Sequence, residues 1–455
     1  MTSVNDYVVN GKAIKDWSIK EHNVALDTLG AHIYKPFHGV LVLGGGSKSY
    51  HLKIRKETED GEVEAEIVDG LACYSAVPFG HRDPVITENV NHFISEMATI
   101  PRSISHSYLG PWLAKLKEFT GMDMFLPKSS GTEANEAAIK AIKKWGKNFG
   151  GKDGKGITGI PVIISANNAF HGRGFGSTAL MDDPISRKDL EPLMAGFEHV
   201  PFDDIEALKA KFREHDGNIA GVFIEPIQAE AGILVPAENY LKEVQQLAKE
   251  NNALFVLDEI QTGFGRTGAN FAWQLYGLER PDLMTIGKAM SSGILPISCL
   301  CGRKEIMELF EPHGEGSTFG GYPLAAFVGL LTIRELENRN ITQLAAKNGH
   351  YLQNKLRKVA NKYPDIVKEV RGKGMLIGVE IFPEYDGHEL SMKLIDNGIY
   401  VKETHETNLR IAPPIVIDHE GMDMIAAAMD VCLAELFEAN LKYSITEKSP
   451  EYVIV

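Results

Sequence analysis

The chain has 455 residues, of which 44% are apolar and 24% are charged, and its formal net charge is −14. This is the composition of a globular protein, and the length predicts more than one hydrophobic core. The acidic balance argues against nucleic-acid binding, and no local basic stretch opposes that conclusion. Four cysteines in so long a chain do not form a disulfide framework.

The sequence shows no sign of export or membrane insertion. Its opening segment, MTSVNDYVVNGKAIKDW, lacks the features of a signal or transit peptide, and no stretch approaches the roughly 18 consecutive apolar residues of a membrane span. We therefore expect a cytoplasmic protein with no membrane partner. Cys299 and Cys301 alternate in LPISCLCGR as in a half-buried strand, and no second Cys or His pair accompanies them, so we expect no metal site.

The middle of the chain alternates short apolar runs with amphipathic segments. This alternation predicts an α/β fold in which helices flank a mainly parallel sheet. The amphipathic segment 237–252 is typical of such a flanking helix. The predicted strands are PVIISA (161–166), GVFIEP (221–226), ALFVLDE (253–259) and DLMTIG (282–287).

The two ends of the chain do not show the regular alternation of strands and helices seen in the middle. Beyond about residue 325, the pattern predicts a helix over 322–340 and a strand over 371–382, both within a smaller α+β unit. Near the amino terminus, residues 44–70 are typical of an elaborated hairpin.

Polar residues follow two neighbouring strands of the predicted sheet. Asp258 comes directly after one apolar run and Lys288 after the next. Ligands of open α/β sheets bind at the carboxyl ends of the strands, so we expect both side chains in one crevice. A lysine among apolar groups has a lowered pKa and attacks aldehydes, while an aspartate can keep a ring nitrogen protonated. The pair therefore suits pyridoxal phosphate, with a buried structural ion pair as the alternative.

The segment KSSGTEANEAAIKAIKKWG (128–146) predicts a helix whose first turn offers a phosphate site. Gly131 and Thr132 lie where free backbone N–H groups and the helix dipole favour a dianion. An ordinary helix cap, formed by Ser130 and the following glutamate, is the alternative interpretation.

A third segment, NNAFHGRGFGST (167–178), offers a cover for a flat cofactor. Phe170 or His171 can stack on a pyridine ring, and Gly172 permits a close backbone approach. Arg173 can bind a substrate carboxylate through two parallel hydrogen bonds, although a lone arginine in a loop is usually a solvated surface residue.

Seven motifs occur in a characteristic order along the chain: SGTEANEAA, AFHGR, EPIQAEAG, LDEIQTGFGRTG, TIGKAMSSG, GSTFGG and RGKGMLIGVE. With these motifs the chain resembles, from about residue 30 to residue 435, class III, ornithine/4-aminobutyrate-type aminotransferases. This resemblance implies a fold-type-I pyridoxal-phosphate fold and a homodimer with shared active sites. It implies an amino-terminal segment over 1–72 that joins the small domain, a large cofactor-binding domain over 73–325 and a small domain over 326–455.

The resemblance implies a role for individual residues. Lys288 corresponds to the lysine that bonds to the cofactor, and Asp258 to the partner of its ring nitrogen. Gln261 corresponds to the residue that binds the ring hydroxyl, and Thr318 to the one that reaches the phosphate from the other subunit. The full set of expected cofactor contacts is Gly131, Thr132, Phe170, His171, Asp258, Gln261, Lys288, Ser317 and Thr318.

Further matches point to the ornithine branch of this family. They place Tyr34, Tyr74 and Arg173 at substrate-binding positions, and they pair Glu230 with Arg410. The pairing has a physical rationale, because Glu230 can mask the positive charge of Arg410 when a substrate presents an ammonium group. A substrate with carboxylates at both ends needs the unmasked arginine, so one site can serve two substrates of opposite charge.

The expected reaction is therefore transfer of the terminal amino group of L-ornithine to 2-oxoglutarate. The expected partners are an amino acid, a 2-oxo acid and a second copy of the chain. Two alternatives stay open at this point: another aminotransferase of the class acting on 4-aminobutyrate, acetylornithine or lysine, and an amino-acid racemase or aminomutase with the same cofactor and fold.

Overall fold

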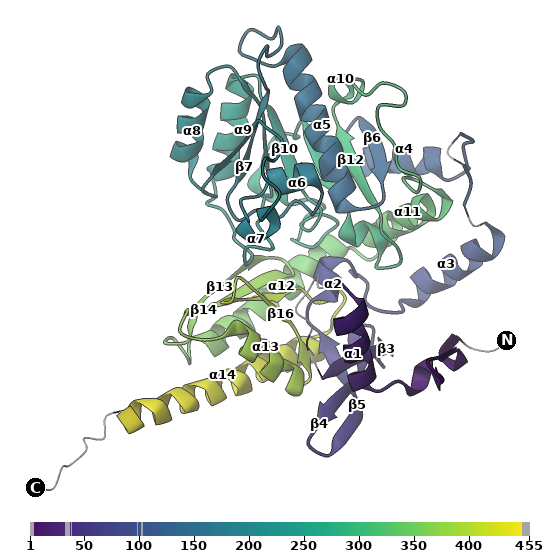
Figure 1. Cartoon of the computed structure of the whole chain (residues 1–455), viewed down its shortest axis with the longest axis vertical. Coiled ribbons are helices and arrows are strands. Elements are labelled where there is room, and N and C mark those ends of the chain that lie inside the picture. Colours follow the sequence, from purple (N-terminus) through teal and green to yellow (C-terminus); the bar gives the residue numbers. More distant parts are fainter. Residues whose placement is uncertain (1–3, 32–36, 38, 98, 102, 448–455) are drawn as a thin grey trace, which may run out of the picture.

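The computed structural model describes residues 4–31, 37, 39–97, 99–101 and 103–447, and these form two lobes (Figure 1). The upper lobe in that view contains a large sheet between helices. The lower lobe is built from both ends of the chain. No helix in the described ranges is both long and apolar enough to cross a membrane.

A seven-stranded sheet forms the centre of the upper lobe, in the order β6-β12-β11-β10-β9-β7-β8. β12 runs antiparallel to both neighbours, whereas the other described pairs are parallel, so the prediction of a mainly parallel sheet is confirmed. The four predicted strands are present, with ends shifted by at most two residues. The strands are β6 (Met124–Lys128), β7 (Val162–Ala166), β8 (Phe197–Val200), β9 (Ile219–Ile224), β10 (Leu254–Asp258), β11 (Leu283–Ile286) and β12 (Ser298–Gly302).

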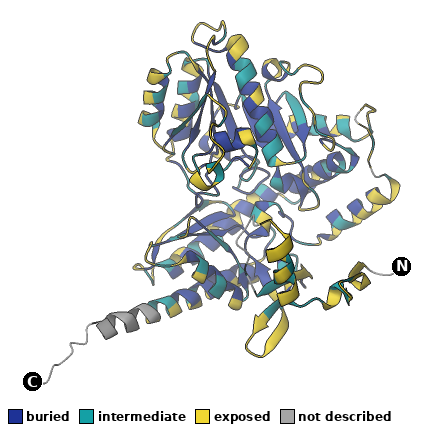
Figure 2. Ribbon diagram, viewed as in Figure 1, coloured by how far each residue is buried: buried dark blue, intermediate teal, exposed yellow. Residues whose placement is uncertain are grey.

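Helices cover both faces of this sheet. Alternate residues of β10 point to opposite sides: Phe255 and Leu257 pack with α8 and α9, whereas Val256 packs with α5. Figure 2 shows the resulting buried layers in dark blue. The helices of the upper lobe are α4 (Leu109–Thr120), α5 (Gly131–Phe149), α6 (Phe175–Ala179), α7 (Pro184–Arg187), α8 (Ile205–Glu214), α9 (Tyr240–Glu250) and α10 (Lys304–Met307).

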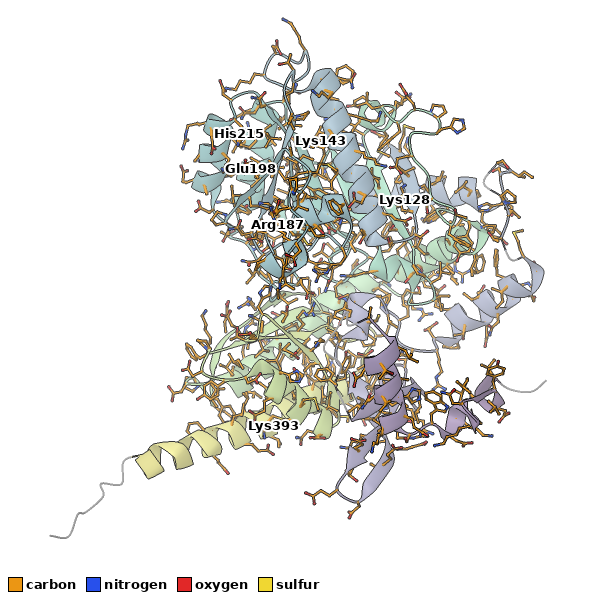
Figure 3. All side chains as sticks on the ribbon, in the orientation of Figure 1. Lys128, Lys143, Arg187, Glu198, His215 and Lys393 are labelled. Carbon is orange, nitrogen blue, oxygen red and sulfur yellow. The ribbon has the colours of Figure 1, made fainter. Side chains whose placement is uncertain are left out.

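A half-buried lysine links α5 to the neighbouring loops. The Nζ of Lys143 donates to the carbonyl oxygens of Pro161 at 2.6 Å and of Ala195 and Gly196 at 3.1 Å each. Burial lowers the pKa of Lys143 to about 8. The side chain lies on the upper part of the large lobe, so this lysine has a structural role there (Figure 3).

The strand predicted at Cys299 and Cys301 is present, but the prediction that it is half-buried is wrong. Both thiols belong to β12 and are fully buried. The reason is that β12 lies between β6 and β11 rather than at an edge, and packing covers both of its faces.

In the lower lobe, β13 (Val367–Lys373), β14 (Leu376–Ile381), β17 (Asn408–Ile411) and β16 (Lys402–Thr404) form a four-stranded sheet in that order. The single strand predicted over 371–382 is therefore wrong, because a turn at Gly374, with φ 55°, divides it into a hairpin. The predicted helix over 322–340 is confirmed. The accompanying helices are α12 (Ile341–Ala360), α13 (Gly387–Asp396) and α14 (His419–Glu447), whereas α11 (Pro323–Asn338) lies beside α4 at the lower edge of the upper lobe (Figure 1).

The amino-terminal segment shares a sheet with the carboxyl-terminal part of the chain. The expected hairpin is present as β4 (His51–Thr58) and β5 (Gly61–Asp69), preceded by β3 (Val40–Gly45). β5 pairs in parallel with β15 (Ile399–Tyr400). The remaining described elements are β1 (Val8–Val9), β2 (Lys12–Ala13), α1 (Ile19–Leu29), α2 (Ala72–Ser75), α3 (Pro84–Glu96) and the short helices Val4–Asp6, Ile14–Asp16, Ala272–Tyr276 and Lys288–Ser291.

Candidate active site

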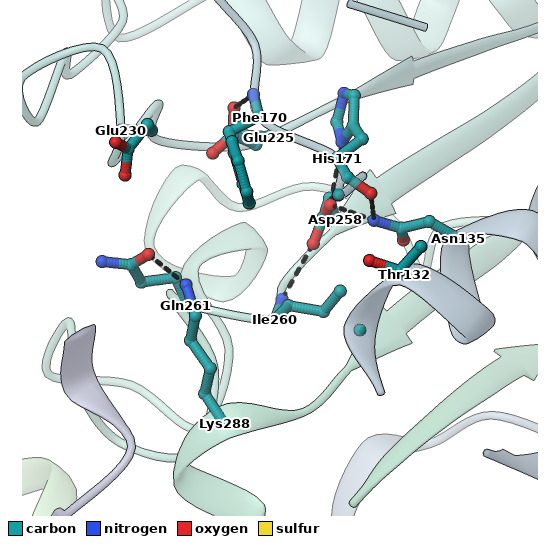
Figure 4. Close-up of a pocket in the computed structure, with 12 residues that line it drawn as sticks. Thr132, Asn135, Phe170, His171, Glu225, Glu230, Asp258, Ile260, Gln261 and Lys288 are labelled. Atoms are coloured by element: carbon teal, nitrogen blue, oxygen red, sulfur yellow. Dashed lines mark hydrogen bonds and ion pairs between the residues drawn. The ribbon is translucent and has the colours of Figure 1, made fainter. Parts of the chain in front are cut away.

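A cavity of about 180 Å³ lies at the carboxyl ends of β10 and β11. These two strands are direct neighbours, with Asp258 opposite Thr285, and they bring Asp258 and Lys288 to the same cavity (Figure 4). The lining residues are Gly131, Thr132, Asn135, Phe170, His171, Gly172, Glu225, Glu230, Asp258, Ile260, Gln261 and Lys288.

Asp258 is held by three hydrogen bonds and is only 4% exposed. Its Oδ2 accepts from Asn135 Nδ2 and from His171 Nδ1, both at 2.8 Å, and its Oδ1 accepts from the backbone N–H of Ile260 at 3.1 Å. Burial opposes a charge on His171, but its hydrogen bond with Asp258 and the nearby carboxylates raise the pKa of the imidazole. These contacts fix one carboxylate at the cavity wall.

Lys288 follows β11 and extends its side chain into the cavity, where Nζ donates to Oε1 of Gln261 (Figure 4). Burial lowers the pKa of Lys288, against the opposing charges of Glu230 and Asp258. A lowered pKa increases the share of neutral amine, which is the nucleophilic form. The backbone of Lys288 has φ 42°, a conformation that non-glycine residues adopt mainly where the surrounding structure imposes it.

The first turn of α5 combines a helix cap with free backbone donors. Ser130 Oγ accepts from the N–H of Glu133 at 3.2 Å, and the Glu133 carboxylate accepts from the N–H of Ser130 at 2.9 Å. The ordinary cap is therefore present. It does not occupy the N–H groups of Gly131 and Thr132, which lie in the turn where helical N–H groups lack an intrahelical acceptor, and both residues line the cavity.

Gly172 brings the loop after β7 against this turn. Its φ is 113°, and a Cβ atom at this position would lie 2.3 Å from Oγ1 of Thr132. Only glycine permits so close an approach. The loop thereby closes one side of the cavity.

Phe170 and His171 occupy different places in this loop. Phe170 lines the cavity, and its backbone N–H donates to Glu225 Oε2 at 3.1 Å. The His171 ring stacks on Phe223, with ring centroids 4.8 Å apart, and bonds to Asp258. Figure 4 shows His171 on the far side of the Asp258 carboxylate from Lys288.

An ion pair between Glu230 and Arg410 borders the cavity. Arg410 comes from β17 in the lower lobe and its side chain is 3% exposed, whereas that of Glu230 is 38% exposed. The guanidinium also lies over the ring of Tyr74, 4.9 Å from its centroid. The site therefore receives residues from both lobes, and Glu230, Arg410 and Tyr74 lie together.

Arg173 lies farther out. Its side chain is 64% exposed, and its guanidinium contacts Asp183 at 3.3 Å and the hydroxyl of Ser186. Ser317 Oγ contacts Ser129 Oγ at 3.2 Å, next to the first turn of α5, and Thr318 is exposed. Tyr34 lies outside the described residues.

Sequence reasoning missed three residues of the cavity, of which Asn135 and Glu225 are polar and Ile260 is apolar. Asn135 lies one helical turn after Gly131 and bonds to Asp258, and a polar residue on the apolar face of α5 was the available signal. Glu225 directly follows β9, and Asp258 is the last residue of the neighbouring strand β10. Burial raises the pKa of Glu225 to about 7.

The residues present fit pyridoxal phosphate. The amide nitrogen Nε2 of Gln261 is buried and has no hydrogen-bond partner in the described structure, so it is available to a ring oxygen. The first turn of α5 offers backbone N–H groups for a phosphate, and Lys288 offers an amine for an aldehyde. Asp258 supplies the carboxylate that a protonated ring nitrogen requires.

Comparison with known proteins agrees with this geometry. The sequence profile of the family described as aminotransferase class-III matches residues 57–433, and the chain belongs to this family. An ornithine aminotransferase from Oceanobacillus iheyensis is 40% identical over 357 residues, which cover 78% of this chain and 86% of the relative. The prediction that the protein is a pyridoxal-phosphate-dependent aminotransferase is confirmed.

Solved structures show the same fold. The crystal structure of the ornithine aminotransferase from Toxoplasma gondii has a TM-score of 0.84 at 29% identity and covers 94% of this chain and 97% of its own. The acetylornithine aminotransferase from Elizabethkingia anophelis has a TM-score of 0.77 at 32% identity, with coverage of 92% and 99%. The predicted fold-type-I architecture is confirmed.

Proposed function

We propose that this enzyme transfers the terminal amino group of L-ornithine to 2-oxoglutarate. The observation that carries the proposal is the ion pair between Glu230 and Arg410 at the border of the Lys288 cavity. The names of the similar curated proteins support the same reaction. We also propose the cytoplasm as its compartment, because all four cysteines are unpaired.

Five residues would hold the cofactor. Lys288 would bond to its aldehyde carbon, Asp258 would contact the ring nitrogen and Gln261 the ring hydroxyl. Gly131 and Thr132 would bind the phosphate through the start of α5. Phe170 would cover one face of the ring, while His171 contributes by holding Asp258.

The bound cofactor supplies an electron sink that makes a C–H bond of the substrate acidic. Lys288 would act as the base that takes the proton from the substrate carbon carrying the reacting amine and delivers it to the cofactor carbon that was its aldehyde. This role needs a neutral amine, and burial of Lys288 lowers its pKa in the required direction. Phe170 and Gly172 cover the cavity and keep bulk water from the reacting carbon.

Glu230 and Arg410 would select the substrates. With the pair closed, Glu230 cancels the charge of Arg410, so the ammonium of ornithine is not repelled. With the pair open, Arg410 can bind the carboxylate next to the oxo group of 2-oxoglutarate, a group that ornithine lacks beside its reacting amine. Tyr74 lies against Arg410 and would line the same pocket, and Tyr34 and Arg173 would bind the other end of the substrate.

We further propose that the active unit is a homodimer with boundaries between its domains near residues 72 and 325. Thr318 is exposed and Phe319 is 51% exposed on a loop next to the first turn of α5. In a dimer this loop would complete the phosphate site of the partner. Light scattering of the purified protein measures the mass directly, and a monomer with full activity would contradict this part.

The test is a panel of amino donors with 2-oxoglutarate as acceptor, assayed for glutamate formation. The panel contains L-ornithine, acetylornithine, 4-aminobutyrate and L-lysine. L-ornithine should have the highest kcat/KM. Acetylornithine is the second candidate, because the Elizabethkingia acetylornithine aminotransferase has a similar structure. If kcat/KM were higher for acetylornithine than for L-ornithine, acetylornithine would become the proposed donor.

The variant Glu230→Ala tests the masking role. Exposing Arg410 should lower kcat/KM for L-ornithine by about tenfold to a hundredfold, about 1.4–2.7 kcal/mol, because the unmasked guanidinium repels the ammonium group of the substrate. The kcat/KM for 2-oxoglutarate should stay the same or rise. Unchanged use of ornithine in Glu230→Ala would refute the masking role.

A further inference from the structure

A second cavity opens next to the cofactor cavity and leads to solvent. The two cavities share Phe170 and Glu230 as lining residues. We call the outer cavity the vestibule; besides these two residues its lining includes Arg173, Asp182, Asp183 and Glu406. The charged side chains of the vestibule are therefore mainly carboxylates, and Arg173 is the arginine among its lining residues.

Arg173 is held at the junction of the two cavities by three contacts. Its guanidinium lies over the ring of Phe170, 5.2 Å from the centroid, so Phe170 separates it from the cofactor cavity. Its NH1 group contacts the Asp183 carboxylate at 3.3 Å and also donates to the hydroxyl of Ser186. Arg173 is thus directed along the wall of the vestibule.

Asp183 is itself fixed in place. It caps α7: its Oδ1 accepts from the N–H of Ile185 at 3.1 Å and its Oδ2 from the N–H of Ser186 at 3.3 Å. The Ser186 hydroxyl donates to the same Oδ2. Pro184 at the first helical position restricts the backbone further. A carboxylate with so many local donors makes a rigid anchor for a flexible arginine.

We propose that Asp183, together with Ser186, is a positioning residue that sets Arg173 for binding the carboxylate shared by both substrates. The inference rests on the proposed function, which needs a carboxylate-binding group that serves donor and acceptor alike. Both substrates carry a carboxylate remote from the carbon that reacts: the carboxylate of L-ornithine, whose terminal amine reacts, and the C5 carboxylate of 2-oxoglutarate, whose C2 oxo group reacts. Loss of Asp183 therefore weakens binding of both substrates.

This role differs from a general effect of vestibule charge. At neutral pH L-ornithine is a cation and 2-oxoglutarate a dianion, so removing any nearby negative charge should weaken the first and strengthen the second. A positioning residue changes both affinities in the same direction. Glu406 provides a matched control, because it lines the same vestibule and is exposed, and its side chain makes no contact with Arg173 in the described structure.

The experiment compares Asp183→Asn with Glu406→Gln in the purified holoenzyme. Asparagine caps helices about as well as aspartate, so α7 should persist. We expect Asp183→Asn to raise KM for both substrates by about fivefold and to leave kcat unchanged. A fivefold change corresponds to the largest contributions that single exposed ion pairs make. Asp183→Glu, which keeps the charge, should restore part of the loss. Glu406→Gln should shift the two KM values in opposite directions or leave them unchanged.

A binding measurement separates this inference from the proposed reaction. Calorimetric titration with glutarate, which has no oxo group and does not react, should show about fivefold weaker binding to Asp183→Asn whether or not ornithine is the true donor. Opposite shifts of the two KM values in Asp183→Asn, or values unchanged or lowered for both, would overturn the inference. If Asp183→Asn fails to fold, Ser186→Ala provides the test, and it should weaken glutarate binding by a smaller factor.

Discussion

The inner wall of the active site and its entrance use similar charged groups in opposite surroundings. At the inner wall, Asp258 is 4% exposed and the side chain of Arg410 is 3% exposed. At the entrance, Arg173 is 64% exposed and its partner Asp183 36%. Breaking a buried pair costs about 3–5 kcal/mol, whereas an exposed pair contributes about 0.2–1 kcal/mol. The inner wall should therefore control chemistry, and the entrance should adjust affinity.

Replacing Lys288 should give the largest effect. Lys288→Ala removes the base and the cofactor-bonding amine together, so turnover should fall by at least about a thousandfold. Steady-state rates of glutamate formation and the visible absorbance of the purified enzyme measure the two losses. Steady-state transamination at the wild-type rate would contradict the role of Lys288.

Lys143 provides the matched control for this test. It is another lysine whose pKa is lowered by partial burial, to about 8, but it lies away from the cavity and bonds to backbone carbonyls (Figure 3). Lys143→Gln should lower the melting temperature and leave kcat and the absorbance unchanged. A similar loss of turnover in both variants would mean that stability, rather than chemistry, explains the effect.

Asp258→Asn should have the next largest effect. It removes the charge at the ring-nitrogen position but keeps a side chain of the same size, and kcat should fall by about a hundredfold to a thousandfold. Asp282→Asn is the control at the opposite end of the same strands, where Asp282 accepts from the N–H of Phe255 at 2.8 Å. That variant should keep kcat. Equal losses in both variants would contradict a special role for Asp258.

The smallest predicted effect concerns Glu225 and the pH dependence of stability. Burial raises its pKa to about 7, so between pH 4.5 and 7 the folded protein holds a proton that the unfolded chain releases. Its contribution to stability is therefore complete below about pH 4.5 and declines toward pH 7 by roughly 1.4 kcal/mol per pH unit. Glu225→Gln should remove this slope in melting temperatures measured at pH 5, 6 and 7.

Glu259 separates stability from function in that experiment. Burial raises its pKa to about 7 as well, but its carboxylate accepts from the N–H groups of Ala272 and Trp273 rather than lining the cavity. Glu259→Gln should flatten the pH slope similarly. Only Glu225→Gln should also change KM, because Glu225 holds the N–H of Phe170. If the pH slope of the melting temperature were unchanged in both variants, Glu225 and Glu259 would not be buried, protonated carboxyl groups.

Much of the fold and of the cavity could be predicted from the sequence, because the signals are local. A polar residue after an apolar run placed Asp258 and Lys288 at the ends of neighbouring strands, and small residues before an amphipathic helix located the first turn of α5. The same reasoning could have identified Glu225, which also follows a buried strand. The role of Asn135 could not be predicted from its motif, because it depends on which face of α5 contacts Asp258.

Other features depend on tertiary contacts that no local pattern records. The ring of His171 bonds to Asp258, 87 positions away along the chain, so its contact could not be read from the loop that contains it. The contact of Arg173 with Asp183 depends on the path of the chain between them. The burial of Cys299 depended on strand order, because alternation alone does not distinguish an edge strand from an interior one.

The parallel pairing of β5 with β15 has a consequence for synthesis of the protein. Val68 pairs with Ile399, so roughly 300 residues must be translated before the amino-terminal hairpin meets its partner strand. At about 5–20 residues per second, this interval lasts on the order of 15–60 s. During that time the edge of β5 that later pairs with β15 is open. The nascent chain then depends on chaperones or on its own charged side chains to avoid pairing with a strand of another nascent chain.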